Sequence, residues 1–585
     1  MKRIFAEYPE ILRKKMMTQT VSWKQKQDVR SLACFRILIG LYILYDILCL
    51  RLMVLDGRNA YVYSLLWYSQ EGYLHPEDTP HKSPIHRLWF SRKYDPSLFF
   101  ALTIILTTFY TIGYKMSSAK MKFLFWFCIV SMQCRCMPPH DGSDTYLRHL
   151  LLWSIFLPMT QVWSLDSYLQ INKINENKTH HLKNEKEEIN KVAVWGLRCQ
   201  IVLMYLGTVF HRTIDVDGTS FFFNQNNDNH WWGPQWTSVY YILHSSFAIR
   251  QNWLGNIIRL HHSPLTQIMT ASAMMCETLL PILCLFLPNS HTPSFLLIFF
   301  HLNLLAVMNL PNWQLVAMIS HTLWIPSSAW DSILQYQLRK YTSTSSRIHT
   351  LNFYSWLFTT HHNHNFNNEN NSTTGLQKKD LLEKNAENIT VVTKKKSFSS
   401  SNKKAVSIFL FVYMFYDFGG NRGWYTKLDH GDIGEFMRFS QYWVMYNSPP
   451  ISSSSILFLG TLKQNTGTST TITKNVNVWK WIRNPNKIET LSLKTISNPQ
   501  EWVHGMTHVY PSPRWERAIH GWIHNQQKLS FFLERFCLQS TNFIELTLIR
   551  SNYRINSPDK SQRFQYHNNP NDTITMNCQN TNTMK

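Results

Sequence analysis

The sequence lacks the short motifs that define several large enzyme classes. It contains no Walker phosphate-binding loop, no dinucleotide-binding glycine fingerprint in a strand context and no nucleophile elbow. No expected helix carries histidines four residues apart, the spacing by which one helix face offers two ligands to zinc. These absences exclude assignment by motif to the P-loop, Rossmann and α/β-hydrolase classes, and we expect no metal site.

The charges also lack the arrangement that binds nucleic acid. The 585 residues carry a formal net charge of +22, but Lys and Arg are spread over the expected loops, without a basic helix or an aromatic RNA-binding platform. Basic loops beside apolar segments instead follow the positive-inside rule and the attraction of anionic headgroups. We expect no cleavable signal peptide, because the first thirty residues are polar and basic and the first apolar run is long enough to anchor.

Apolar residues are clustered in nine segments, several of which approach the ~20 residues that cross a hydrocarbon core. These segments cover residues 32–50, 97–114, 123–132, 146–158, 192–210, 266–288, 294–310, 313–325 and 405–418. The shorter ones suit tilted helices or helices inside a bundle. The pattern predicts a mainly α fold, a polytopic transmembrane bundle of about nine spans in the lipid bilayer, with a smaller α+β C-terminal soluble domain.

Loop charges predict the topology and the domain boundaries. The basic segment 1–30 is expected in the cytosol, before an apolar bundle over 31–331 and a last transmembrane helix over 405–418. Ser238–Ile249 is short and interrupted by polar residues, so we interpret it as interfacial or re-entrant. The Asn-, Ser-, Thr- and Lys-rich insert 339–404 is then cytosolic and disordered. If Ser238–Ile249 spans instead, the side of the C-terminal domain is reversed.

The C-terminal part has a different character. Within a soluble α+β domain over 419–555, β-branched and alternating residues predict strands, and one amphipathic stretch predicts a helix. The strands are expected at 455–462, 476–482 and 544–550, and the helix at 514–539. The tail 556–585 is polar and expected to be mobile. Cys537 and Cys578 pair if this region is lumenal, and the sequon at Asn571 then meets the glycosylation machinery.

The order of the motifs resembles the HTTM (horizontally transferred transmembrane) domain, which is shared with vitamin K-dependent gamma-carboxylases. Ser31–Asp46 and Val130–Asp166 carry the resemblance: Arg135 and Asp144 match the family pattern, while Cys136 replaces its usual Asn. Later segments that resemble family helices are 277–288, 300–331 and 433–450. The resemblance implies a membrane enzyme of the endoplasmic reticulum or another endomembrane, with a quinone such as reduced vitamin K as cofactor.

The resemblance also places a candidate catalytic base after the fifth span, where the carboxylases have a lysine. His211 and Arg212 occupy that place. Arginine stays protonated near neutral pH, whereas histidine can accept a proton there. His211 is therefore a candidate catalytic residue, although the missing lysine argues against carboxylation. In the alternative interpretation, Arg212 anchors the helix end at headgroups and His211 packs at the interface.

Glu277 is the most informative single residue, because it lies in the middle of an apolar segment, where an ionised carboxylate is costly. Pro281, four residues later, cannot donate to the carbonyl of Glu277. Arg36, Arg198 and His301 are its candidate partners. Glu277 is either a catalytic or ligand site in the bundle or one end of an interhelical hydrogen bond that holds the fold.

Further candidate ligand-binding residues lie at two places. Asp144 or Ser143 is expected to cap a helix, on which Asp144 pairs with Arg148 four residues later. Together with Asp141 and His149 they form a polar cluster that either lines a cavity or merely caps the helix and reaches headgroups. His301 and Asn309, eight residues apart, are expected on one helix face, where they line a groove or bind neighbouring helices.

These features predict an integral membrane protein of the HTTM type, a lipid- or quinone-linked enzyme without the carboxylase lysine. A non-enzymatic membrane scaffold or a small-molecule carrier is the alternative. Convergence of Glu277, His301 and the His211 region on one cleft favours the enzyme or the carrier, whereas separate packing of each favours the scaffold.

Overall fold

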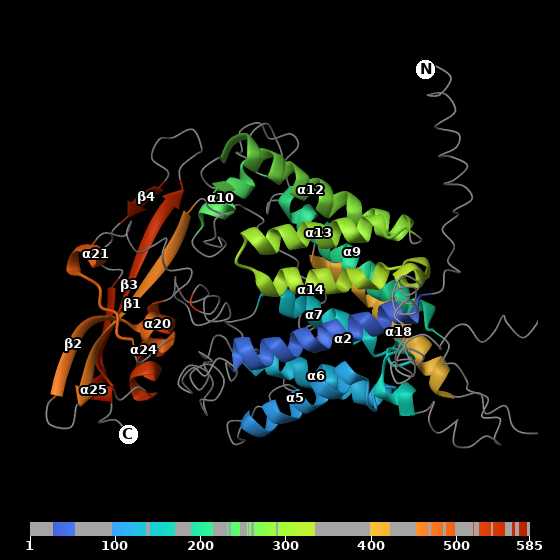
Figure 1. Cartoon of the computed structure of the whole chain (residues 1–585), viewed down its shortest axis with the longest axis horizontal. Coiled ribbons are helices and arrows are strands. Elements are labelled where there is room, and N and C mark those ends of the chain that lie inside the picture. Colours follow the sequence, from blue (N-terminus) through green and yellow to red (C-terminus); the bar gives the residue numbers. More distant parts are fainter. Residues whose placement is uncertain are drawn as a thin grey trace, which may run out of the picture.

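The computed structural model describes a mostly helical chain with a small C-terminal sheet at one end of a helical bundle (Figure 1). The described residues are 27–52, 96–135, 141–169, 189–213, 236–245, 262–287, 290–333, 398–421, 452–465, 470–483, 487–497, 526–539, 542–555, 564–567 and 573–581, with positions 231, 254, 257, 258 and 519. Segment 1–26, most of the insert 339–404, residues 422–451 and Asn571 lie outside them.

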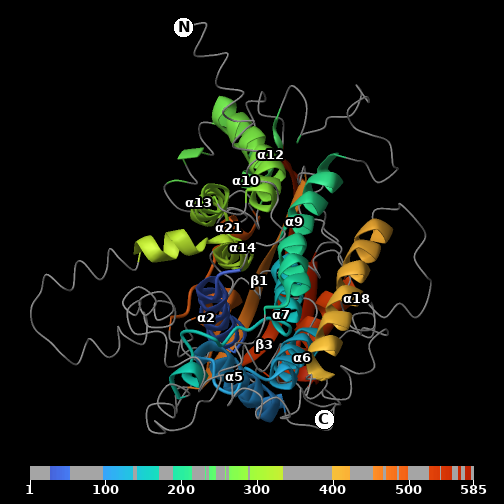
Figure 2. The same cartoon turned by 90° about the vertical axis from the view of Figure 1, so that its right-hand side faces the viewer.

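Ten α-helices and two short helices of other types form the bundle among the described residues. In chain order they are α2 (Val29–Tyr45), the π-helix η1 (Asp46–Arg51), α5 (Pro96–Ile112), α6 (Ala119–Arg135), α7 (Gly142–Ser154), α9 (Lys191–Thr213), α10 (Ser238–His244), α12 (His262–Phe286), α13 (Thr292–Val307), α14 (Pro311–His321), the 3-10 helix η6 (Thr322–Trp324) and α18 (Phe398–Asn421). Central α9 packs against α7, α12 and α18 (Figure 2).

Local chemistry explains several helix boundaries and contacts. Asp28 caps α2, its side chain accepting from the backbone N–H of Arg30 at 2.7 Å. Pro311 opens α14 at the position where its missing N–H has no helical partner to lose. Close packing of α7 on α9 requires a glycine, because a Cβ at Gly196 would lie 2.3 Å from the ring of Trp153.

Three of the described helices are long and apolar enough to cross a membrane: Val29–Arg51, Lys191–Thr213 and Pro264–Phe286. Ser97–Ile112 and Thr292–Val307 are apolar but shorter. Apart from the largely buried Lys191–Thr213, these helices turn large apolar side chains outward, among them Ile268, Met275 and Phe299. By length and composition, some of the described helices could therefore cross a membrane.

The described part of the chain has fewer membrane-length helices than the nine predicted spans. The apolar run that begins at Tyr146 is helical only to Ser154, so it is too short to cross. Similarly, the two apolar runs between residues 294 and 325 fold as short helices, separated where Met308 leaves the helical conformation. The helix α10, in the segment interpreted as interfacial or re-entrant, has seven residues, all but one of them buried.

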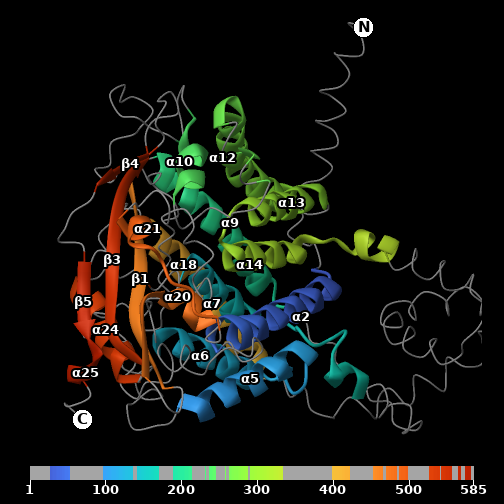
Figure 3. The same cartoon turned by 60° about the vertical axis from the view of Figure 1, so that its left-hand side comes forward.

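The C-terminal sheet is antiparallel and has five strands. They are β1 (Ser452–Asn465), β2 (Thr470–Asn477), β3 (Phe543–Ile555), β4 (Phe564–His567) and β5 (Thr573–Asn577), in the order β2-β1-β3-β4, with β5 also paired to β3. The short helices α20 (Val478–Arg483), α21 (Leu493–Ser497) and α25 (Cys578–Thr581), and the longer α24 (Gln526–Gln539), complete this region (Figure 3). Phe458, Trp479, Phe532 and Phe536 pack together in its core.

The sheet confirms two of the predicted strands and corrects two other predictions. The stretches 455–462 and 544–550 lie in β1 and β3, but only the first two residues of 476–482 are a strand. The remainder forms α20, because Asn477 Oδ1 accepts from the backbone N–H of Lys480 and so begins a helix. The tail 556–585, predicted to be mobile, supplies β4 and β5.

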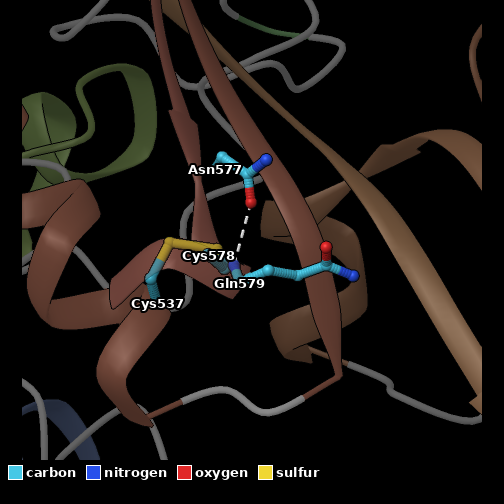
Figure 4. The surroundings of a disulfide bond; sticks show 4 residues. All are labelled: Cys537, Asn577, Cys578 and Gln579. Carbon is cyan, nitrogen blue, oxygen red and sulfur yellow. Dashed lines mark hydrogen bonds between the residues drawn. A yellow bond between two sulfur atoms is a disulfide. The ribbon is translucent and has the colours of Figure 1, made fainter. Parts of the chain in front are cut away.

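A disulfide joins Cys537 on α24 to Cys578 at the start of α25 (Figure 4). The sequence allowed this pairing but did not decide it, and the structure contains the bond. Next to it, the Asn577 side chain accepts from the backbone N–H of Gln579 at 2.9 Å, which starts the short α25. The bond ties the tail and β5 to α24.

Candidate functional site

A cavity of about 370 Å³ lies between α9, α10, α12, α13 and the beginning of α14. Its volume falls in the range of small-molecule sites, roughly 300–1,000 Å³. Most of its walls are aliphatic or aromatic, and the polar residues among the described walls are few. The walls consist of Arg212, Trp231, Val239, Ile242, Leu243, Leu254, Ile258, Ile268, Met269, Ser272, Ala273, Glu277, Phe300, Asn303, Leu304, Val307, Met308, Leu310, Trp313 and Gln314.

An ion pair forms part of the wall. Arg212, in the last turn of α9, donates through Nη1 to Glu277 Oε2 on α12. Both residues are nearly buried, at 4% and 8% exposure. The guanidinium also lies over the indole of Trp231, 3.9 Å from the ring centroid, in a cation–π contact. Pairing lowers the cost of keeping Arg212 and Glu277 charged away from water.

The partner of Glu277 was not among the predicted candidates. Arg36 donates through Nη2 to the carbonyl of Trp163. Arg198 donates to Gln27 Oε1 at 2.9 Å and lies over the ring of Trp324. The interpretation of Arg212 as a headgroup anchor is wrong, because the side chain is buried and turned toward α12.

His301 belongs to a buried chain of hydrogen bonds that ends at the cavity. Its Nδ1 contacts Gln314 Oε1 at 2.6 Å and its Nε2 contacts the hydroxyl of Tyr205, which also contacts His321 Nε2 at 2.8 Å. With Gln314 Oε1 as acceptor, His301 Nδ1 donates, the Tyr205 hydroxyl donates to His301 Nε2, and His321 Nε2 donates to the Tyr205 oxygen. Both imidazoles are then neutral, and the chain ends in Gln314, a residue of the wall.

Asn309 does not share a helix face with His301. The helix α13 ends at Val307, and Met308 is extended, with φ −104° and ψ 146°. Asn309 therefore lies beyond the helix, and the described walls of the cavity do not include it. The polar partner of His301 comes instead from the next helix, as Gln314.

Asp144 lies in a second buried ion cluster, which we call the Arg51 cluster (Asp46, Arg51 and Asp144). Arg51 Nε donates to Asp46 Oδ2 at 2.6 Å, and its Nη2 donates to Asp144 Oδ1 at 2.7 Å. Gln133 Nε2 also donates to Asp144 Oδ1, at 3.1 Å. All three charged residues are buried.

The predicted pair of Asp144 with Arg148 is replaced by the Arg51 cluster. Arg148 Nη2 donates to Thr145 Oγ1 at 2.8 Å, and His149 Nδ1 to the carbonyl of Thr145 at 2.7 Å. The helix is capped by Asp141 rather than by Asp144 or Ser143, because α7 begins at Gly142. Asp144 accepts from the backbone N–H of Asp141 and so completes a capping box.

The predicted residues thus divide into two groups. Glu277 lines the cavity, and His301 reaches it through Gln314. The described walls include none of Asp144, Arg148 and His149. His211 is half-buried on α9, next to Arg212, and is also absent from these walls. The described residues contain no group of three or more His, Cys, Asp or Glu arranged to hold a metal ion.

Sequence reasoning missed three contributors, namely Tyr205, Gln314 and the role of Trp231. Tyr205 and Gln314 are polar interruptions of apolar runs, the same signal by which Glu277 was found. No protein-family model, no curated protein and no solved structure matches this chain. The HTTM relationship accordingly remains a prediction from motifs, and the functional argument depends on the cavity.

Proposed function

We propose that the chain is a multi-pass membrane protein that binds a lipid-like or quinone-like small molecule inside its helical bundle. The observation that supports this proposal is the cavity of about 370 Å³, with mainly apolar walls and a few polar groups. Ligand sites typically combine such walls with a small number of orienting polar groups. The long apolar helices α9 and α12 contribute to it, so a ligand dissolved in the membrane is the natural occupant.

We further propose an endomembrane location with the C-terminal sheet on the lumenal side. The disulfide between Cys537 and Cys578 supports this placement, because disulfides persist in oxidising compartments and are rare in the cytosol. The motifs that resemble the HTTM domain agree with it.

A lipid- or quinone-linked enzyme is the second candidate, favoured by the hydrogen-bonded chain from His321 through Tyr205 and His301 to Gln314. Such a chain of neutral groups positions a hydrogen-bond donor at the cavity. Neither His211 nor Arg212 offers the carboxylase chemistry there, since His211 is not in the described walls and an arginine is not a base. We therefore favour a ligand-binding protein over an enzyme. A small-molecule carrier is as consistent with the cavity as any other ligand-binding protein.

The test is to purify the full chain in mild detergent and to identify co-purifying small molecules by mass spectrometry. Ala273 lies in the wall, so Ala273→Phe fills the cavity with a phenyl ring. Glu534→Gln, at an exposed residue of α24 far from the cavity walls, is the control. We expect one lipid or quinone to be enriched with the wild type and the control and lost with Ala273→Phe. Equal small-molecule content in all three proteins would refute the proposal.

A further inference from the structure

The charges on the cavity walls determine which head group a ligand can carry. Among the described walls there is one cation, Arg212, and one anion, Glu277, and these two neutralise each other. An anionic ligand would place a second negative charge beside Glu277, and a cationic ligand a second positive charge beside Arg212. Either arrangement leaves a buried charge without compensation, which is costly.

The remaining polar walls offer hydrogen bonds of both kinds. Gln314 accepts from His301 through Oε1, so its amide nitrogen is the end left to donate to an occupant. Asn303 donates through Nδ2 to the carbonyl of Phe299 at 2.7 Å, so its Oδ1 is the end left to accept. A hydroxyl both donates and accepts, so it can satisfy either amide without adding a charge.

The volume limits the rest of the ligand. A cavity of this volume accepts a small ligand with one hydrocarbon chain. The aliphatic walls, including Ile242, Leu243 and Val307, suit such a chain.

We infer that the cavity selects an uncharged single-chain alcohol over a fatty acid of the same length, and that the Arg212–Glu277 pair is the selectivity element. This inference rests on the proposed function and specifies its ligand class. Glu277 disfavours carboxylates because its negative charge already compensates the positive charge of Arg212. Removing the charge of Glu277 therefore changes the preferred head group without changing the apolar walls.

The experiment compares two probes of equal length, 1-dodecanol and dodecanoate, by native mass spectrometry of the full chain at neutral pH. The proteins are the wild type, Glu277→Gln, Ala273→Phe and Glu534→Gln. For the wild type and Glu534→Gln we expect dodecanol to bind about tenfold more tightly, a difference of roughly 1.4 kcal/mol. Glu277→Gln should reverse that preference, because the wall then carries the positive charge of Arg212 without the Glu277 carboxylate. Ala273→Phe should weaken both probes.

Two kinds of result would overturn the inference, and they differ in what they say about the proposed function. If the wild type binds both probes and prefers dodecanoate, or if Glu277→Gln keeps the wild-type ratio, the selectivity element is wrong while ligand binding stands. If the wild type binds neither probe, the inferred ligand class is wrong, and the co-purification test decides separately whether the proposed function stands. Should Glu277→Gln not fold, the preference of the wild type alone decides.

Discussion

Two of the arginine–carboxylate groups in the described part of the helical bundle are deeply buried but differ in what surrounds them. In the Arg51 cluster, one guanidinium is shared by Asp46 and Asp144, and Gln133 adds a further donor to Asp144. In the second group, Arg212 meets the single carboxylate of Glu277 on the wall of a cavity. Both groups pair an arginine with carboxylates, but Arg212 and Glu277 line the described cavity, whose described walls include no member of the Arg51 cluster.

The Arg51 cluster connects separate parts of the bundle. Asp46 and Arg51 belong to η1, Gln133 to α6 and Asp144 to α7. Because Asp144 also completes the capping box of α7, the start of this helix is coupled to the ion cluster. We therefore interpret the cluster as a structural element that holds η1, α6 and α7 together. Burial of charge alone does not indicate a functional site, whereas burial beside an apolar cavity does.

The largest effect on stability is expected from Asp144→Asn, which removes one carboxylate from the Arg51 cluster. Arg51 keeps Asp46 as its counter-charge, but an amide at position 144 must turn its NH2 toward either Arg51 or the backbone N–H of Asp141, so hydrogen bonds worth about 1.5–3 kcal/mol each to a charged group are lost. The measurement is thermal unfolding of the detergent-solubilised full chain. Asp331→Asn is the control, since Asp331 is 57% exposed in its pair with Arg30 and should change stability by at most about 1 kcal/mol. Equal losses from the two variants would contradict the structural role.

A smaller loss is expected from Glu277→Gln. The amide oxygen of glutamine still accepts from Arg212, and water in the adjoining cavity can solvate the guanidinium. We expect a loss of about 1–3 kcal/mol, the cost of a weakened buried hydrogen bond, in the same unfolding measurement. A loss as large as that of Asp144→Asn would mean that the two ion groups do not differ, and the comparison would fail.

Features that depend on nearby residues could be predicted from the sequence. The polar turn before α7 indicated a capped helix, and the cap lies only a few residues from its predicted place. Alternating residues in β1 and β3 indicated strands because the side-chain period of a strand is two. The membrane character followed from the clustering of apolar residues, but the number of spans did not, because short apolar helices can be buried within a bundle.

Contacts between distant helices could not be predicted in the same way. Arg212 and Glu277 are 65 residues apart, and the choice among Arg36, Arg198 and Arg212 depends on how α9 is rotated against α12. Successive residues of a helix point about 100° apart. Arg212 can therefore lie on the cavity wall while its neighbour His211 lies outside the described walls. The resemblance drew attention to His211 and Arg212, but the sequence could not indicate that Arg212, rather than His211, lies in the described cavity wall.

The smallest loss of stability is expected at Asp141. Comparing it with Asp144 distinguishes capping of α7 from the contact that this end of the helix makes with Arg51. Asp141 caps the helix by accepting from the backbone N–H of Ser143 at 2.8 Å, whereas Asp144 also binds Arg51. Asp141→Ala should cost about 1 kcal/mol of unfolding free energy, and Asp141→Asn should be nearly neutral, because asparagine caps helices as well as aspartate does. If Asp141→Ala lost as much stability as Asp144→Asn, the local helix start, rather than the Arg51 cluster, would hold this end of α7. We instead expect Asp144→Asn to lower the free energy of unfolding far more than Asp141→Ala does. That result would show that the Arg51 cluster is the dominant contact at this end of α7.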